Sequence, residues 1–174
     1  ETLAKYQVIV QSASTGRVKV LDAVDYFSFE YSTYGTISSV ATKAEQAITS
    51  AIMSVSDKNP ITVAFSTGSS EEDSTAVQKL LSDNGYLITT VNILTQEIPC
   101  EADFLVVFGP KTDLDDTTIG NIDKWLDNNG EFGKNLFYFS SFSQGDTKGI
   151  DSFLKEWGLE IPQSIVYQGN SQYT

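Results

Sequence analysis

The chain has 174 residues, of which 40% are hydrophobic and 20% are charged. This length and composition fit a globular domain with a substantial core, and no apolar run reaches the ~18 residues of a membrane helix. The net charge is −12, with 11 basic and 23 acidic residues, which argues against nucleic acid or anionic lipid as a partner. There is no histidine, so the commonest general base and every Ser-His or Cys-His dyad are excluded.

The N-terminal segment, residues 1–41, is rich in β-forming residues. Two such runs, 6–10 and 17–21, are separated by small polar residues, which predicts a hairpin or a loop. Aromatic residues follow at 26–34 and alternate with polar ones, as they do in a strand. Residues 35–39 are predicted to form a weakly specified loop.

Residues 42–174 predict a second segment in the order helix, strand, helix, strand, strand, helix, strand, helix, strand. Thr42 and Glu45 match a capping box at the start of the first helix. Residues 61–66 form a buried-type strand, and Ser70 is predicted to cap the second helix.

The second half of this segment repeats the pattern of a strand followed by a capped helix. Strands are predicted at 86–94, at 104–108 and at 136–139, and the most hydrophobic, 104–108, is expected to be central. Asp113 is predicted to cap the third helix, and Asp146 or Thr147 the fourth. A last short strand is expected at 165–167.

Repeated strand-turn-helix units predict an α/β fold, with a mostly parallel sheet and helices on both faces. Residues 1–41 are expected to pack on this 42–174 domain. Ligands of parallel sheets bind beyond the carboxyl ends of the strands, so the two strand-to-helix turns are the candidate ligand site. Its residues are Thr67, Gly68, Ser69, Ser70, Gly109, Pro110, Lys111 and Thr112.

Neither turn matches a phosphate-binding loop, because the Walker pattern is absent. The acidic residues 71–73 are expected in the first helical turn, where they satisfy the helix dipole and repel phosphate. Asp113, Asp115 and Asp116 also fit an acidic first turn, and the spacing of a calcium loop is absent. No metal or cofactor is therefore predicted. The turn after the first strand could still bind a neutral polar ligand.

The chain is predicted not to be an enzyme. Its single cysteine, Cys100, precedes a strand and lacks the Gly-x-Cys-x-Gly pattern of a nucleophile elbow. Acidic residues on the C-terminal side, Glu101 and Asp103, work against a reactive thiolate. No other residue in the two turns is an obvious catalytic group.

The aromatic stretch is the candidate interaction surface, because aromatic residues dominate the energetics of protein interfaces. It could equally pack onto its own domain, and the sequence leaves both interpretations open. The residues in question are Tyr26, Phe27, Phe29 and Tyr31.

Several segments resemble the auxiliary domain of ABC-type transport systems, the family of the gliding-motility-associated ABC transporter auxiliary component. Residues 45–52 followed by 61–68 are similar to its first half, and residues 102–114 and 130–140 to its second half; residues 21–28 also fit. The resemblance implies a flavodoxin-like or class I glutamine-amidotransferase-like α/β domain. It also implies an extracytoplasmic location, a membrane anchor in the full-length protein, and the membrane and ATPase subunits of an ABC transporter as partners.

One turn departs from the family pattern. The family has Thr-Gly-His-Gly-Glu after its first core strand, whereas this chain has Thr67-Gly68-Ser69-Ser70-Glu71. A binding role of that turn, if the family has one, is therefore altered here.

The sequence thus predicts a non-enzymatic auxiliary domain that acts by protein interaction or ligand binding. The alternatives are a small-ligand or glycan sensor that uses the two turns and, with less support, a hydrolase built from carboxylates and serines alone. Because the chain begins with Glu1 rather than Met, we expect it to be a piece of a longer protein. The resemblance implies that this longer protein is anchored in a membrane.

Overall fold

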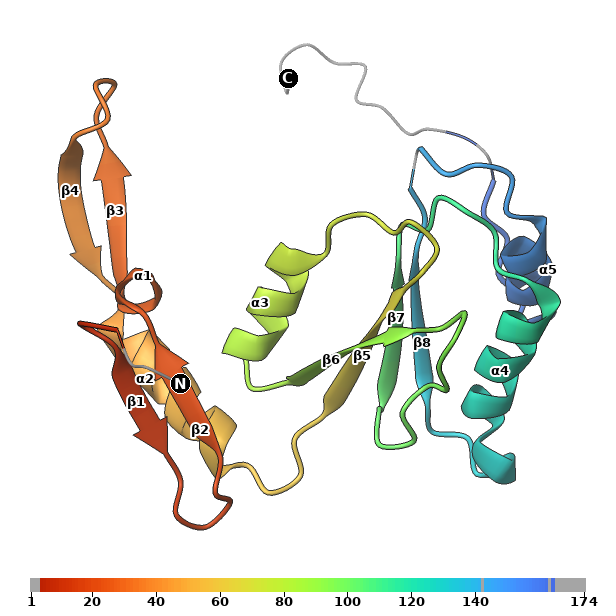
Figure 1. Ribbon diagram of the computed structural model, residues 1–174, viewed down its shortest axis with the longest axis horizontal. Coiled ribbons are helices and arrows are strands. Elements are labelled where there is room, and N and C mark those ends of the chain that lie inside the picture. Colours follow the sequence, from red (N-terminus) through yellow and green to blue (C-terminus); the bar gives the residue numbers. More distant parts are fainter. Residues whose placement is uncertain (1–3, 142, 163, 165–174) are drawn as a thin grey trace. The chain divides into compact units, whose positions relative to one another are not determined.

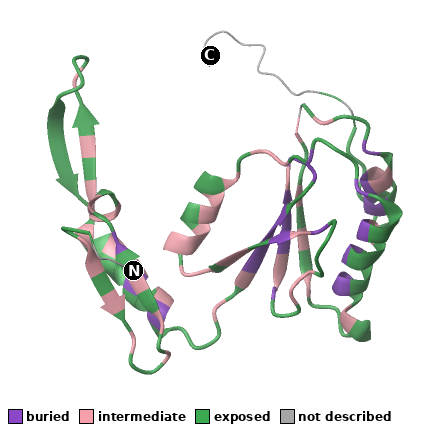
Figure 2. Ribbon diagram, in the orientation of Figure 1, coloured by how far each residue is buried: buried purple, intermediate pink, exposed green. Residues whose placement is uncertain are grey.

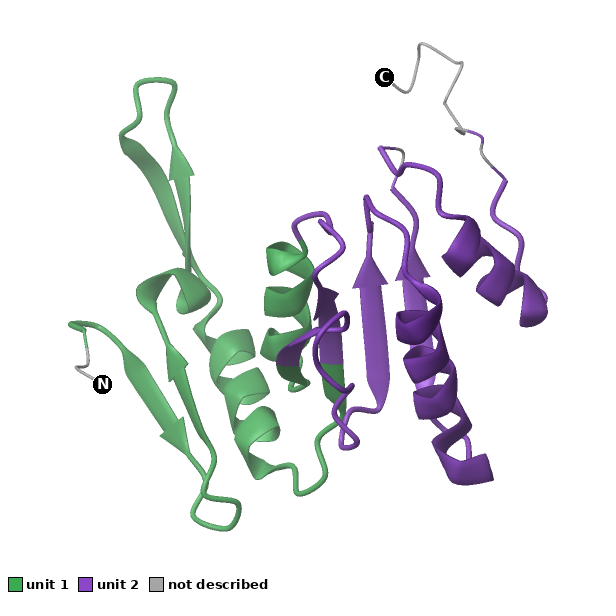
Figure 3. Cartoon of the chain, turned by 45° about the vertical axis from the view of Figure 1, so that its right-hand side comes forward, with its two compact units in different colours: residues 1–63, 74–88 green, residues 64–73, 89–174 purple. Residues whose placement is uncertain are grey.

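The computed structural model describes residues 4–141, 143–162 and 164 (Figure 1). The strand predicted at 165–167 lies outside these residues. The chain divides into two compact units (Figure 3). The first comprises Glu1–Val63 and Ser74–Ile88, and the second comprises Ala64–Asp73 and Thr89–Thr174.

The first unit begins with an antiparallel hairpin of β1 (Val8–Gln11) and β2 (Val18–Leu21), which confirms the predicted pair of strands. A short helix, α1 (Ala23–Tyr26), follows and was not predicted. The Asp22 N–H donates to the Asp25 carboxylate over 2.8 Å, which fixes this single turn. Four residues are too few to show a helical hydrophobic period, so the sequence gives no sign of α1.

A second antiparallel hairpin pairs β3 (Phe27–Tyr31) with β4 (Ile37–Thr42). The alternating aromatic strand is confirmed, but the loop predicted at 35–39 is wrong, because β4 already begins at Ile37. The turn is closed earlier, where the Ser32 N–H donates to the Thr36 carbonyl over 2.7 Å. The small polar residues of β4 carry no hydrophobic alternation, yet their backbone pairs with β3.

Helix α2 (Ala44–Ser56) also starts differently from the prediction. Thr42 is the last residue of β4, so the capping box of Thr42 and Glu45 is wrong and Lys43 occupies the N-cap position. The Thr42 hydroxyl still accepts the Ala44 N–H over 3.2 Å. Ala51 and Val55 form the buried part of the helix. Helix α3 (Thr75–Asp83) completes the first unit.

The main sheet is parallel and has the order β6-β5-β7-β8. Its strands are β5 (Thr62–Thr67), β6 (Leu87–Asn92), β7 (Phe104–Phe108) and β8 (Asn135–Phe139). Strand β7 lies between β5 and β8, so its predicted central place is confirmed. The α/β class and the parallel sheet are likewise as predicted, whereas β1–β2 and β3–β4 form separate antiparallel pairs.

The core of the second unit lies between the sheet and two helices, α4 (Asp116–Asp127) and α5 (Lys148–Glu156). Figure 2 marks the buried residues in purple, and many of them lie on the strands of the sheet and along α4 and α5. Leu105 and Val107 of β7 are fully buried with Ile122 and Ile150 of the helices. Trp157 follows the last residue of α5 and is 51% exposed.

None of the helices in the described part of the chain is long and apolar enough to cross a membrane.

Candidate functional site

The two strand-to-helix turns contact each other through their backbones. The Ser69 carbonyl accepts the N–H groups of Lys111, over 3.0 Å, and of Thr112, over 3.2 Å. In return, the Glu72 N–H donates to the carbonyls of Phe108 and Gly109, over 3.0 and 3.1 Å. The turns therefore meet at one edge of the sheet, but hydrogen bonds join them where an open crevice was expected.

Burial divides the predicted ligand site into two groups. Ser69 is fully buried, and its hydroxyl has no hydrogen-bond partner. Gly109 and Pro110 are buried as well. The exposed residues are Thr67, Gly68, Ser70, Lys111 and Thr112. A ligand at this edge would meet this exposed set without touching the Ser69 hydroxyl, and ligand binding there stays a prediction.

The turn after β5 does not lead directly into a helix. Ser70 has a left-handed backbone with φ 55°, and α3 begins only at Thr75, so the predicted Ser70 cap is wrong. Residues 71–73 therefore do not form an acidic first helical turn. Instead, the Glu71 carboxylate accepts the Ser69 N–H over 2.9 Å and the Ser66 hydroxyl over 3.1 Å. The Glu71 carboxylate therefore forms hydrogen bonds within its own loop and with the end of β5.

The polar cluster around Glu72 was not predicted from the sequence. The hydroxyls of Ser141 and Ser143 each donate to Glu72 Oε1 over 2.9 Å, and Lys111 Nζ lies 3.5 Å away. These residues join the turn after β5 to the segments after β7 and β8. Gly109 makes the approach possible, because a Cβ there would lie 2.5 Å from Glu72 Cγ. Glu72 is about seventy positions from Ser141 and Ser143 in the sequence, so no local sequence pattern indicates the cluster.

The electrostatics of the cluster argue against general-base catalysis. The hydrogen bonds from Ser143 and Ser141, together with nearby Lys111, hold the pKa of Glu72 below its usual value. A general base works best when its pKa lies near the operating pH. Glu72 is therefore a weak base for either serine, and the cluster ties the three loops together.

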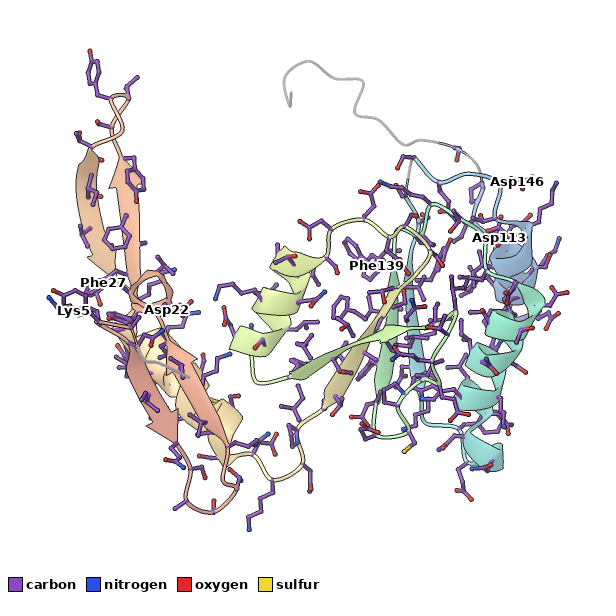
Figure 4. All side chains as sticks on the ribbon, in the orientation of Figure 1. Lys5, Asp22, Phe27, Asp113, Phe139 and Asp146 are labelled. Carbon is purple, nitrogen blue, oxygen red and sulfur yellow. The ribbon has the colours of Figure 1, made fainter. Side chains whose placement is uncertain are left out.

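The three aspartates of the turn after β7 have separate roles. Asp115 caps α4, since its carboxylate accepts the Thr118 N–H over 2.7 Å; this bond lowers the pKa of Asp115. The prediction that Asp113 caps this helix is wrong. Asp113 lies at the start of α5 instead (Figure 4), where its carboxylate accepts the N–H groups of Gly149 and Ile150, over 2.7 and 3.2 Å.

No group of three His, Cys, Asp or Glu side chains suited to a metal ion occurs among the residues that the structure describes. Cys100 is exposed and precedes β7, and its Sγ lies 3.6 Å from the Glu101 carboxylate.

The aromatic stretch divides at Phe29. The Tyr26 hydroxyl donates to the Tyr6 carbonyl, and the Phe27 ring lies 4.9 Å from the Tyr26 ring and 6.2 Å from that of Phe29. These rings are half-buried within the first unit. Tyr31, in contrast, is 65% exposed.

Tyr31 belongs to a larger exposed apolar surface on the hairpin. The register places Val40 opposite Phe29 and Ile37 opposite Tyr31, so four apolar side chains share one side of β3–β4. We call this surface, formed by Phe29, Tyr31, Ile37 and Val40, the hairpin face. Its residues on β4 are more than half exposed. Only its β3 half was predicted as an interaction surface, because residues 35–39, the first part of β4 included, were predicted as a loop.

Comparison with known proteins does not assign this chain to a family. No model of a protein family matches the sequence, and no curated protein matches it. A solved structure, the mmIFT52 N-terminal domain, is similar to it with 21% identity and a TM-score of 0.43. The match covers 55% of this chain and 43% of that one, so it spans less than half of the known domain.

Proposed function

We propose that this chain is a non-enzymatic interaction domain that binds a protein partner through the hairpin face. The observation that carries the proposal is the exposure of this face on a hairpin that pairs with no third strand in the described part of the chain. A two-stranded hairpin is only marginally stable in water by itself. Exposed apolar patches on such elements mark interaction sites.

The assembly that we propose is an ABC-type transport system, whose membrane and ATPase subunits are the partners. The proposed location of this domain is the extracytoplasmic side of the membrane. Support for this part comes from the resemblance of residues 45–52, 61–68, 102–114 and 130–140 to the auxiliary component. The full-length gene tests it: membrane helices in the same protein and a neighbouring ATPase gene are expected. If both are absent, the assignment to an ABC-type transport system is wrong, whereas the proposed binding through the hairpin face is not affected.

The hairpin face predicts a specific loss of binding. Changing Tyr31 and Val40 together to Ser should weaken binding to the co-expressed transporter subunits by more than about tenfold, because buried interface aromatics contribute about 2 kcal/mol or more each. Affinity can be measured by titration of the purified subunits. Val18→Ser is the matched control, since Val18 is 52% exposed on the other hairpin. Equal affinities of the double variant and the control would refute the hairpin face as the contact.

The non-enzymatic part of the proposal is tested by assay. Esters, glutamine and phosphate esters should show no turnover, since there is no histidine and Glu72 is a weak base. Ser141→Ala and Cys100→Ala remove the hydroxyl and the thiol best placed beside carboxylates. Turnover that survives purification and disappears in either variant would contradict the proposal.

A ligand sensor is the second candidate, and one observation favours it. Thr67, Ser70, Lys111 and Thr112 present hydroxyls and an ammonium group from two turns that are bonded to each other. A sugar or peptide that binds there would raise the melting temperature, because a ligand of the native state stabilises it. Chemical shift changes confined to these residues, without any at the hairpin face, would favour the sensor over the interaction domain.

A further inference from the structure

Strand β4 has an outer edge that pairs with no strand in the described part of the chain. Its only neighbour in the sheet is β3, and all six of its residues are exposed. Within the first unit, the hairpin of β3 and β4 extends beyond α1 (Figure 1). An unpaired edge of this kind is a template for a further strand.

The register shows which backbone groups of β4 point outward. The Lys43 N–H donates to the Tyr26 carbonyl over 2.9 Å, so these two residues form a hydrogen-bonded pair at the base of the hairpin. Hydrogen-bonded and non-hydrogen-bonded pairs alternate along an antiparallel ladder. Thr42 and Val40 therefore belong to non-hydrogen-bonded pairs with β3. Their N–H and C=O groups consequently point away from β3, to the outer side of the hairpin.

This edge lacks most of the features that protect edge strands from further pairing. Charged side chains, proline and bulges are the usual protection. Residues 31–42 contain neither a charged residue nor a proline, although 20% of the whole chain is charged. A register shift leaves Ser38 without a partner on β3, and this irregularity lies toward the tip of the hairpin. Residues 39–42 therefore form a regular, uncharged edge.

We propose that a second copy of this chain adds its β4 antiparallel to this edge, which gives a dimer with the strand order β3-β4-β4-β3. Twofold symmetry is the commonest arrangement of homo-oligomers, and it requires an edge that is complementary to itself. The outward groups meet this requirement when Val40 of one copy lies opposite Thr42 of the other, because each such pair exchanges two backbone hydrogen bonds. Ala41 of one copy then lies opposite Ala41 of the other, on the twofold axis.

The side chains fit this register. Val40 and Thr42 are both β-branched and lie on the side of the hairpin face. Ala41 is small enough to face its equivalent at the close spacing of a non-hydrogen-bonded pair. Ser39 lies opposite Lys43 of the other copy, so no like charges are brought together. Like charges directly opposite each other destabilise a sheet, and this register avoids them.

The charge distribution of the chain permits the contact. A net charge of −12 works against self-association, but the first unit contains six basic and seven acidic residues and carries only −1 of it. The four-stranded sheet replaces a two-stranded hairpin that is only marginally stable by itself. Since the twofold axis is perpendicular to the sheet, the hairpin faces of both copies lie on the same side. The dimer therefore goes beyond the proposed partner binding and leaves that surface uncovered.

Analytical ultracentrifugation of the purified chain tests the dimer without any transporter subunit, so the result does not depend on the proposed partner. The average mass should rise with protein concentration from 19.1 kDa toward twice that value. Ala41→Lys should raise the dissociation constant of the dimer by at least about fivefold, because it places like charges directly opposite each other. Ser28→Lys is the matched control, since Ser28 is exposed opposite Ala41 on β3 and does not face its equivalent in the dimer.

An engineered disulfide tests the register. In a Cys100→Ala background, Ala41→Cys should form a covalent dimer in oxidised glutathione. The Cα atoms of a non-hydrogen-bonded antiparallel pair lie about 4.5 Å apart, which a disulfide can bridge. Ser28→Cys in the same background should stay monomeric on a non-reducing gel. A chain that is monomeric at every concentration overturns the proposal, and so does a dimer that Ala41→Lys does not weaken or that Ala41→Cys does not capture.

Discussion

Leu105→Ala is expected to lower the free energy of unfolding of the second unit by about 3–5 kcal/mol. Leu105 lies on the inner strand β7 and is fully buried among Ala64, Val107 and the residues of α4 and α5. Truncation removes the transfer free energy of the lost methyl groups and leaves a cavity, which close-packed neighbours fill only partly.

Urea unfolding followed by tryptophan fluorescence measures this loss, because Trp125 and Trp157 both belong to the second unit. Leu159→Ala is the matched control: Leu159 is 57% exposed in the second unit, so its truncation should change stability by no more than about 0.5 kcal/mol. A loss below about 1 kcal/mol at Leu105 would mean that the sheet is not packed as described.

The sequence predicts the four strands of the main sheet because each is rich in hydrophobic or β-branched residues. Residues 104–108 are apolar throughout, as an inner strand of a parallel sheet must be, and β7 occupies that place. Strand β4 is different: Ser38 and Ser39 lie in it, and all six of its residues are exposed. This strand is defined only by its backbone pairing with β3. Its side chains show no hydrophobic period from which the strand could be predicted.

Helix caps were predicted less well than the strands, for a physical reason. Thr42, Ser70 and Asp113 are polar residues that precede apolar helical periods in the sequence, which is the pattern of an N-cap. The structure uses Thr42 as a strand residue and gives Ser70 a left-handed backbone. A polar residue before a helix has several ways to bond the backbone, and tertiary packing decides among them.

Contacts in the candidate site between residues far apart in the sequence are likewise decided by tertiary packing. Its two turns meet because the carboxyl ends of neighbouring parallel strands share an edge, and the sequence predicts that arrangement. The bonds from Ser141 and Ser143 to Glu72 depend on the path of the loop after β8. That path follows from packing, and no spacing in the sequence encodes it.

Asp113→Ala is expected to lower the free energy of unfolding by about 1–3 kcal/mol, although Asp113 itself is exposed. Its carboxylate accepts the N–H groups of Gly149 and Ile150 in the first turn of α5. These N–H groups have no intrahelical acceptor, and Ile150 is fully buried, so water cannot easily replace the lost carboxylate.

Asp146→Ala provides the control for charge. Asp146 precedes the same helix and pairs with Lys148 over 2.8 Å, but both side chains are more than half exposed. Surface pairs of this kind contribute about 0–1 kcal/mol, so this variant should stay close to the parent in urea unfolding. Asp113→Asn should fall between the two, because an amide oxygen can accept only part of what two carboxylate oxygens accept. If Asp113→Ala and Asp146→Ala lose the same stability, the general negative charge matters and the specific bonds from α5 do not.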